Sequence, residues 1–444
     1  MRPLPSDERQ VILLELNEVN FEYLQSYIDM GHLPHFAKIL KQHPLIITTS
    51  EQRYEELEPW IQWVTAHTGL SFAEHGVFRL GDIVHHDIQQ IWEFLEDHEI
   101  SVGAISPINA ANRTKNAAFF LPDPWTKTKV TGGKLLRQLS KAISQAVNDN
   151  ANSHITGSSI FWILVGLARY APWNNYPHYF SLIANVLKRK SWAKAQLLDE
   201  LLVDVAIAEM NKTRPEFVSI FLNAAAHIQH HYIFNSRVYG GQRRNPEWLV
   251  SKTEDPVLDV YSQYDRIVGR IVRDLPNSRI MIATGLHQDA YTKEKYYWRL
   301  INPSQFLDLI GVDYLSILPR MSRDFLVECS TVESARIAEE LLNQVQSTDG
   351  SPLFDVDNRG ASLFVTLVFP DDVTRDTKIT FSGKTYSDLH QQVAFVAIKN
   401  GMHNGEGYLI DTGSLSPSGL TVPLKLLPDR IASAFGLKWP LRPE

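Results

Sequence analysis

The chain has 444 residues, of which 44% are hydrophobic and 21% are charged, and its formal net charge is −7. This balance is typical of a globular protein and excludes a disordered one, and the length allows one large domain with an insertion or two domains of ordinary size. The acidic net charge gives no electrostatic footprint for nucleic acid. The single cysteine, Cys329, excludes an internal disulfide and a cysteine-based zinc cluster.

The apolar stretches of the sequence are short. Val11–Leu16 is too short for the core of a signal peptide, and the longest later run, around 160–167, is far below the length of a membrane-crossing helix. We therefore expect a cytoplasmic protein with a small-molecule substrate, no nucleic-acid partner and no membrane partner. Assembly into a homo-oligomer stays open.

Strands and helices alternate through most of the chain. The predicted elements, in chain order, are a strand over 11–16, helices over 21–30, 33–42 and 59–67, a strand over 101–106, almost wholly helical structure over 133–211, a strand over 217–223, an amphipathic helix over 259–273 and a strand over 278–283. This alternation predicts a doubly wound, mostly parallel α/β sheet.

A change of composition after residue 300 predicts an inserted domain. Residues 301–395 contain the strand-like runs FLVEC and LFVTLVF on either side of a helix over 332–345, followed by the turn-rich run TFSGKTYSD. We interpret 1–300 as an α/β core, 301–395 as a small α/β cap domain and 396–444 as the return of the chain to the core.

Polar clusters accompany the predicted strands, and the carboxyl ends of strands are where open parallel sheets bind ligands. The clusters are Glu15 to Glu18, Glu55 to Trp60, Asn223 to His227, Thr284 to Asp289 and Gly401 to Gly407. Imidazoles and carboxylates are common ligands of transition metals. His227, His287 and His403 come from three separate strand ends, so we expect them to be metal ligands. We interpret His230 and His231 as surface or supporting residues.

The order and spacing of these segments resemble the type I phosphodiesterases and nucleotide pyrophosphatases of the alkaline phosphatase superfamily. The family's first strand ends in Asp-Gly, where this chain has LELNEVN, and AHTGLSFAEHG at 66–76 is similar to the end of its nucleophile helix. Its Asp-x-x-x-His corresponds to Asn223 and His227, and its late Gly-x-His-x-x-x-Gly to Gly401–Gly407. The resemblance covers nearly the whole chain and implies an alkaline phosphatase-like core.

The chain departs from the family at the anionic ligands and the nucleophile. Asn17 stands where the family has its first metal-binding aspartate, Asn223 where it has another, and the carboxylate expected beside His287 is missing. The nucleophile position falls at about Pro59, which cannot react, next to Glu58. Because the lost carboxylates would hold two cations close together, we do not expect an intact two-zinc site.

Three functions stay open. In the first, His227 and His403, helped by His287 and Asn223, bind one zinc or manganese ion for hydrolysis or transfer of a phosphoester-like group on a small sugar- or nucleotide-linked substrate. Glu58 or Glu18 would then be the general base, or Glu58 the nucleophile. In the second, Glu58 works with His227 and without a metal, in acid/base or transfer chemistry on a sugar or another small polar substrate. In the third, the chain is an inactive binding relative.

The candidate substrate-binding residues lie around the same strand ends. Asn17 would line the altered second metal position, and Glu406 belongs to the Gly401–Gly407 segment. Trp60 and Trp63 would stack a sugar or a nucleotide base, although tryptophans at this spacing also fit simple core packing. The density of acidic and imidazole groups favours an enzyme.

Overall fold

The computed structural model describes residues 10–148, 155–320, 323–414 and 416–440. The chain divides into two compact units. The first unit comprises Met1–Ser144, Ser158–Ala290 and Asn400–Glu444, and the second comprises Gln145–Gly157 and Tyr291–Lys399. The residues expected in a cap domain, 301–395, all belong to the second unit. Among the described residues, no helix is both long enough and apolar enough to cross a membrane.

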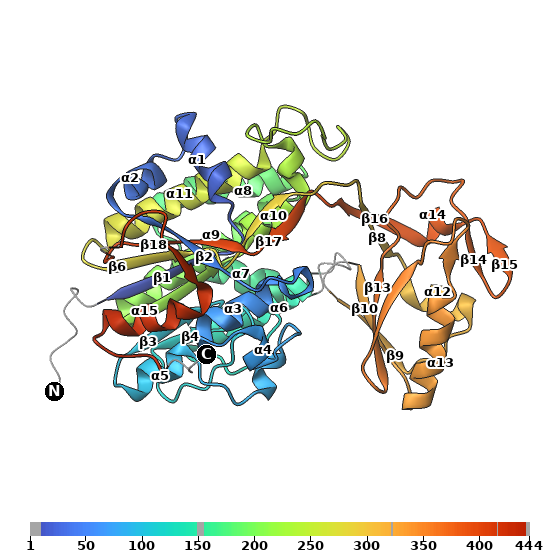
Figure 1. The fold of residues 1–444 in the computed structure, drawn as a ribbon, viewed down its shortest axis with the longest axis horizontal. Coiled ribbons are helices and arrows are strands. Elements are labelled where there is room, and N and C mark those ends of the chain that lie inside the picture. The colour runs from blue at the N-terminus through green and yellow to red at the C-terminus, as the bar shows by residue number, and fades with distance from the viewer. Residues whose placement is uncertain (1–9, 149–154, 321–322, 415, 441–444) are drawn as a thin grey trace. The chain divides into compact units, whose positions relative to one another are not determined.

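An eight-stranded sheet forms the centre of the first unit (Figure 1), in the order β19-β2-β18-β6-β1-β5-β3-β4. The strands are β1 Val11–Leu16, β2 Leu45–Thr49, β3 Val102–Ile105, β4 Phe119–Leu121, β5 Phe217–Leu222, β6 Arg279–Ala283, β18 Glu406–Asp411 and β19 Thr421–Pro423. Strand β1 pairs in parallel with β5 and β6, whereas β18 is antiparallel to β6 and β2. The mostly parallel α/β sheet predicted from the sequence is confirmed.

Helices cover both faces of this sheet, which is why every residue of β1 and β5 is buried and apolar runs form these strands. Figure 1 shows α1, α2 and α11 on one side of β1 and β6, and α3, α5 and α15 on the other. The helices that lie wholly or mostly in the first unit are α1 Phe21–Asp29, α2 Pro34–Gln42, α3 Pro59–Thr68, α4 Phe72–His75, α5 Ile91–Asp97, α6 Lys134–Asn148, α7 Gly157–Tyr170, α8 Tyr176–Leu187, α9 Ala193–Thr213, α10 Ala224–Tyr232, α11 Pro256–Asp274 and α15 Leu427–Ala434.

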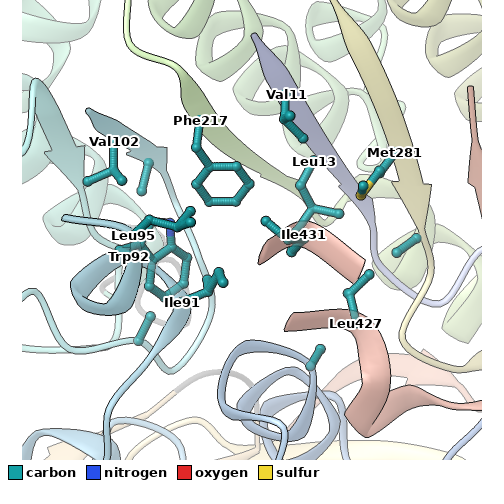
Figure 2. Packing of buried hydrophobic residues seen from close by; sticks show 14 of the residues in the cluster. Val11, Leu13, Ile91, Trp92, Leu95, Val102, Phe217, Met281, Leu427 and Ile431 are labelled. Atoms are coloured by element: carbon teal, nitrogen blue, oxygen red, sulfur yellow. The ribbon is translucent and has the colours of Figure 1, made fainter. Parts of the chain in front are cut away.

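Figure 2 shows the core on one face of the sheet. Val11 and Leu13 lie two residues apart on β1 and therefore point to the same face. There they share a buried cluster with side chains from β5, β6, α5 and α15. The residues labelled in this cluster are Val11, Leu13, Ile91, Trp92, Leu95, Val102, Phe217, Met281, Leu427 and Ile431. This packing holds β1 rigidly between its neighbours and so fixes the point where β1 ends.

The second unit has a core of its own. Its four-stranded antiparallel sheet has the order β12-β13-β10-β9, and α13 packs on β12. A buried cluster that includes Phe306, Leu342 and Val365 fills its interior. Its elements are β8 Tyr296–Leu300, α12 Pro303–Ile310, β9 Ser316–Pro319, β10 Asp324–Glu328, α13 Val332–Asn343, β11 Gln346–Ser347, β12 Phe354–Asn358, β13 Ser362–Leu367, β14 Ile379–Phe381, β15 Lys384–Tyr386, α14 Leu389–Gln392 and β16 Val393–Ile398.

Candidate metal centre

The turn after β1 has a backbone conformation that an L-residue adopts at a cost. Glu18 has a φ of 61°, in the left-handed region, which costs a non-glycine residue about 1–2 kcal/mol. Two hydrogen bonds fix this turn: the Glu18 N–H donates to the Thr284 carbonyl at 3.1 Å, and Gln229 Nε2 donates to the Glu18 carbonyl at 2.7 Å. The turn therefore holds Glu18 where β1, β5 and β6 end together.

Glu18 meets two imidazoles from other parts of the first unit. Its Oε2 lies 3.2 Å from Nε2 of His230, on α10, and 3.2 Å from Nε2 of His403, on β17 Gly401–Asn404. The two Nε2 atoms are 3.3 Å apart. One ligand atom from each of these three residues lies within 4.8 Å of the others. One carboxylate and two imidazoles are the donor set of a catalytic zinc site that keeps positions open for other ligands.

The carboxylate of Glu18 is buried and charged. Burial acts to raise its pKa, but His403 and His230 together hold the pKa of Glu18 well below its ordinary range. Asn17 Nδ2 donates to Oε1 at 3.1 Å, and Nε2 of the buried Gln288 donates to Oε2. Glu18 is therefore an oriented anion at the centre of the cluster.

Two amides lie beside Glu18, at the positions where the resemblance places metal-binding aspartates. Asn17 Nδ2 donates to Asn223 Oδ1 at 2.8 Å, and Trp63 Nε1 donates to Asn17 Oδ1 at 2.8 Å. Neutral amides that satisfy each other need no cation between them, unlike two carboxylates. This half of the site therefore lacks the negative charge that a second divalent ion requires.

Glu58 approaches the cluster from the start of α3. Its Oε2 lies 3.8 Å from His403 Nδ1, and its side chain is about one third exposed, at 34%. Glu58 precedes Pro59, the first residue of α3, and its carbonyl accepts the N–H of Ile61 at 2.8 Å. His403 consequently has one carboxylate at each ring nitrogen, and Glu58 is the accessible one.

The structure places the other two histidine candidates outside this cluster. His227 lies one turn before His230 on α10, has an exposed side chain, and packs its ring 5.0 Å from that of His231. His287, on β7 His287–Ala290, is buried, with Nδ1 2.7 Å from the Glu406 carbonyl oxygen and Nε2 3.3 Å from Asp289 Oδ1. Both ring nitrogens of His287 thus serve the local structure.

The candidate substrate-binding residues lie in different environments. Trp63 is fully buried in the core, so its ring has no surface for stacking a substrate, and its N–H supports Asn17 instead. Trp60 is partly buried, and its indole N–H donates to the Phe78 carbonyl at 3.0 Å. Glu406 is exposed.

The sequence predicted a surface or supporting role for His230, not a place among the ligands, and it gave no role to the two glutamines, Gln229 and Gln288. The spacing of His227, His230 and His231 puts all three near one side of a helix, and helical spacing alone does not select the ring that faces Glu18. The glutamines bear no metal-ligand signal, because their part is to fix the backbone and the carboxylate of Glu18.

A buried carboxylate of α9 positions the turn that leads into α10. Asp199 accepts hydrogen bonds from the Ala224 N–H at 2.8 Å, the Asn223 N–H at 3.2 Å and the Tyr264 hydroxyl at 2.6 Å. Burial outweighs these bonds and raises the pKa of Asp199 to about 6. The orientation of the His230-bearing helix thus depends on a group that titrates above its ordinary range.

We expect this titration to appear in the stability of the protein. Between about pH 4 and pH 6, Asp199 is protonated in the folded state and ionised in the unfolded state. The stabilisation of the folded state by this proton is therefore complete below about pH 4, and it is lost as the pH rises through about 6. When the pH is lowered from 7 to 4, the unfolding free energy of the wild type should rise by about 2 kcal/mol relative to that of Asp199→Asn. Urea unfolding of both proteins at the two pH values measures it, and a pH-independent difference would contradict it.

No family model matches the chain, and no curated protein matches it. Solved structures do match. The phosphonoacetate hydrolase from Sinorhizobium meliloti 1021 is 13% identical, with a TM-score of 0.44 over 96% of both chains. Murine ectonucleotide pyrophosphatase/phosphodiesterase 5 is 10% identical, with a TM-score of 0.45 over 97% of this chain and 96% of that one.

The alkaline phosphatase PafA is 11% identical, with a TM-score of 0.46 over 99% of this chain and 97% of that one. These likenesses at low identity concern the fold. Alkaline phosphatases are among the matched structures.

Proposed function

We propose that the protein is an enzyme that hydrolyses or transfers a phosphoester-like group with one divalent cation, zinc or manganese, held by Glu18, His230 and His403. The observation that supports this most directly is the convergence of these three side chains from the end of β1, from α10 and from β17, a strand of a separate two-stranded sheet. Burying a carboxylate and two imidazoles side by side costs free energy unless the three groups bind a common ion or substrate.

The donor set fits such an ion. Glu18 is ionised and buried, and Asn17 and Gln288 orient its two oxygens. With one carboxylate as the only anionic ligand, a divalent cation would keep a net positive charge, which attracts a phosphoester anion. Bound there, the ion supplies Lewis-acid polarisation of a phosphoryl oxygen.

The chain itself supplies the proton transfer. Glu58 is the accessible carboxylate, and its contact with His403 Nδ1 directs its Oε2 toward the cluster. It would accept the proton of an attacking water or hydroxyl, or attack phosphorus itself. Glu18, expected from the sequence as a possible base, is instead occupied by the two imidazoles and suits the role of ligand.

A metal-free reaction is the second candidate. The 3.8 Å approach of Glu58 Oε2 to His403 Nδ1 supports it, because a carboxylate beside an imidazole can carry out acid/base chemistry without an ion. The imidazole beside Glu58 is therefore His403 and not His227, the partner expected from the sequence.

Turnover of simple phosphoesters after removal of metal separates the two candidates. We expect chelator-treated protein to hydrolyse bis-p-nitrophenyl phosphate only after zinc or manganese is restored. Glu58→Gln should lower kcat about 100-fold or more and still bind one equivalent of metal. Glu55→Gln, on the same segment, is the matched control and should keep full activity. Turnover that survives chelation would favour the metal-free reaction.

A further inference from the structure

The helix pair α7–α8, taken as residues 158–187 of the first unit, exposes apolar side chains where a surface helix normally has polar ones. Trp173, between the two helices, is 88% exposed. The other exposed large apolar side chains of this pair are Ile160, Phe161, Leu164, Phe180 and Leu187. An exposed apolar surface of this kind indicates an interaction site.

The polar groups of the same pair point inward. Asn175 Nδ2 donates to Glu200 Oε1 at 2.7 Å, and the Tyr179 hydroxyl donates to Asp204 Oδ2 at 2.7 Å, both on α9. On α7, a Cβ at Gly166 would lie 3.0 Å from Leu139 of α6, so α7 also packs closely on its neighbour. The pair is therefore anchored by buried polar contacts and presents its apolar side outward.

Basic residues are frequent in the part of the sequence that contains these two helices. Residues 124–198 contain ten lysines and arginines and one acidic residue, a net charge of +9 in a chain whose net charge is −7. Nine of the ten are exposed, and seven of these lie on or beside the helices: Lys134, Arg137 and Lys141 on α6, Arg169 on α7, Lys188 and Arg189 directly after α8, and Lys194 on α9.

This combination identifies the kind of partner. Helices with Trp, Phe and Leu on one side and Lys or Arg beside them bind in the headgroup region of anionic membranes. A symmetric contact with a second copy would bring the same positive charges against each other. The cores of protein interfaces are also depleted of lysine. An anionic lipid surface is complementary to both the apolar and the basic groups.

We infer that the α7–α8 pair attaches the protein peripherally to a bilayer of anionic phospholipid, with Trp173, Phe161 and Phe180 among the lipid headgroups and Lys188 and Arg189 against their phosphates. The sequence predicts no membrane partner, because its apolar runs are too short to cross a bilayer. Two short helices lying on the surface give no such signal, and their exposure becomes visible only in the fold.

Sedimentation with lipid vesicles tests this attachment. The full-length protein should bind vesicles of phosphatidylcholine with about one third phosphatidylglycerol at least tenfold more tightly than pure phosphatidylcholine, and added salt should weaken the binding. The double variant Trp173→Ser/Phe180→Ser should lower binding to the anionic vesicles about tenfold. Lys188→Ala/Arg189→Ala should do the same.

Matched controls and a second measurement keep the test decisive. Trp248→Ser removes another exposed tryptophan, and Lys38→Ala/Lys41→Ala removes two exposed lysines of α2; both should bind as wild type does. Absence of binding to anionic vesicles, or equal binding by Lys188→Ala/Arg189→Ala and wild type, would overturn the inference. So would a lipid-free dimer, seen by sedimentation equilibrium, that Trp173→Ser dissociates, because the apolar surface would then belong to a second copy.

Discussion

Glu18→Gln should abolish the binding of zinc or manganese. Glutamine has nearly the shape of glutamate, but it removes the only carboxylate among the three clustered ligand residues, Glu18, His230 and His403. Changes to residues that merely orient a metal ligand cost about 10–100-fold in affinity, so loss of this ligand should exceed about 100-fold. Metal analysis of the dialysed protein and a calorimetric titration would show it, with activity falling in parallel.

The histidines of α10 provide a matched pair of controls for the same experiment. His230→Ala should lose the metal as Glu18→Gln does, whereas His227→Ala, one turn earlier on the same helix, should keep one equivalent. The opposite result, with metal lost in His227→Ala and kept in His230→Ala, would contradict the structural assignment. It would restore the pair expected from the sequence, His227 with His403.

Much of the first unit could be predicted because its strands are apolar runs with sharp ends. The strand over 11–16 is predicted and observed with the same bounds, and those over 217–223 and 278–283 differ by one residue at one end. Parallel neighbours end at one edge of a sheet, so Glu18 and Asn223 could be assigned to one region without coordinates.

The detail of the site could not be predicted, because it depends on rotations and turns. The rotation of α10 about its axis, which the contacts of Asp199 help to set, decides that His230 rather than His227 meets Glu18. Likewise, the spacing of Trp60 and Trp63 fits either a core or a binding surface. The burial of Trp63 follows from the packing of α3 on the sheet.

Arg270→Ala should cost about 3–5 kcal/mol of unfolding free energy, the largest effect on stability that we expect from a single substitution. Arg270, on α11, is buried, with Nη1 2.7 Å from Glu200 Oε1 and Nη2 paired with Asp204. Burial acts to raise the pKa of Glu200, but His178 and Arg266 hold it well below its ordinary range, so it stays ionised. Removing Arg270 leaves the carboxylates of Glu200 and Asp204 buried without the positive charge that offsets theirs.

Urea unfolding followed by circular dichroism would measure this loss, with Arg273→Ala as the matched control on the same helix. Arg273 is exposed and pairs with the adjacent Asp274, so its removal should change the unfolding free energy by about 0.5 kcal/mol at most. The double variant Arg270→Ala/Asp204→Asn should be more stable than Arg270→Ala alone, because the uncompensated charge is gone. If the double variant is no more stable, the loss comes from packing, and the charge explanation is wrong.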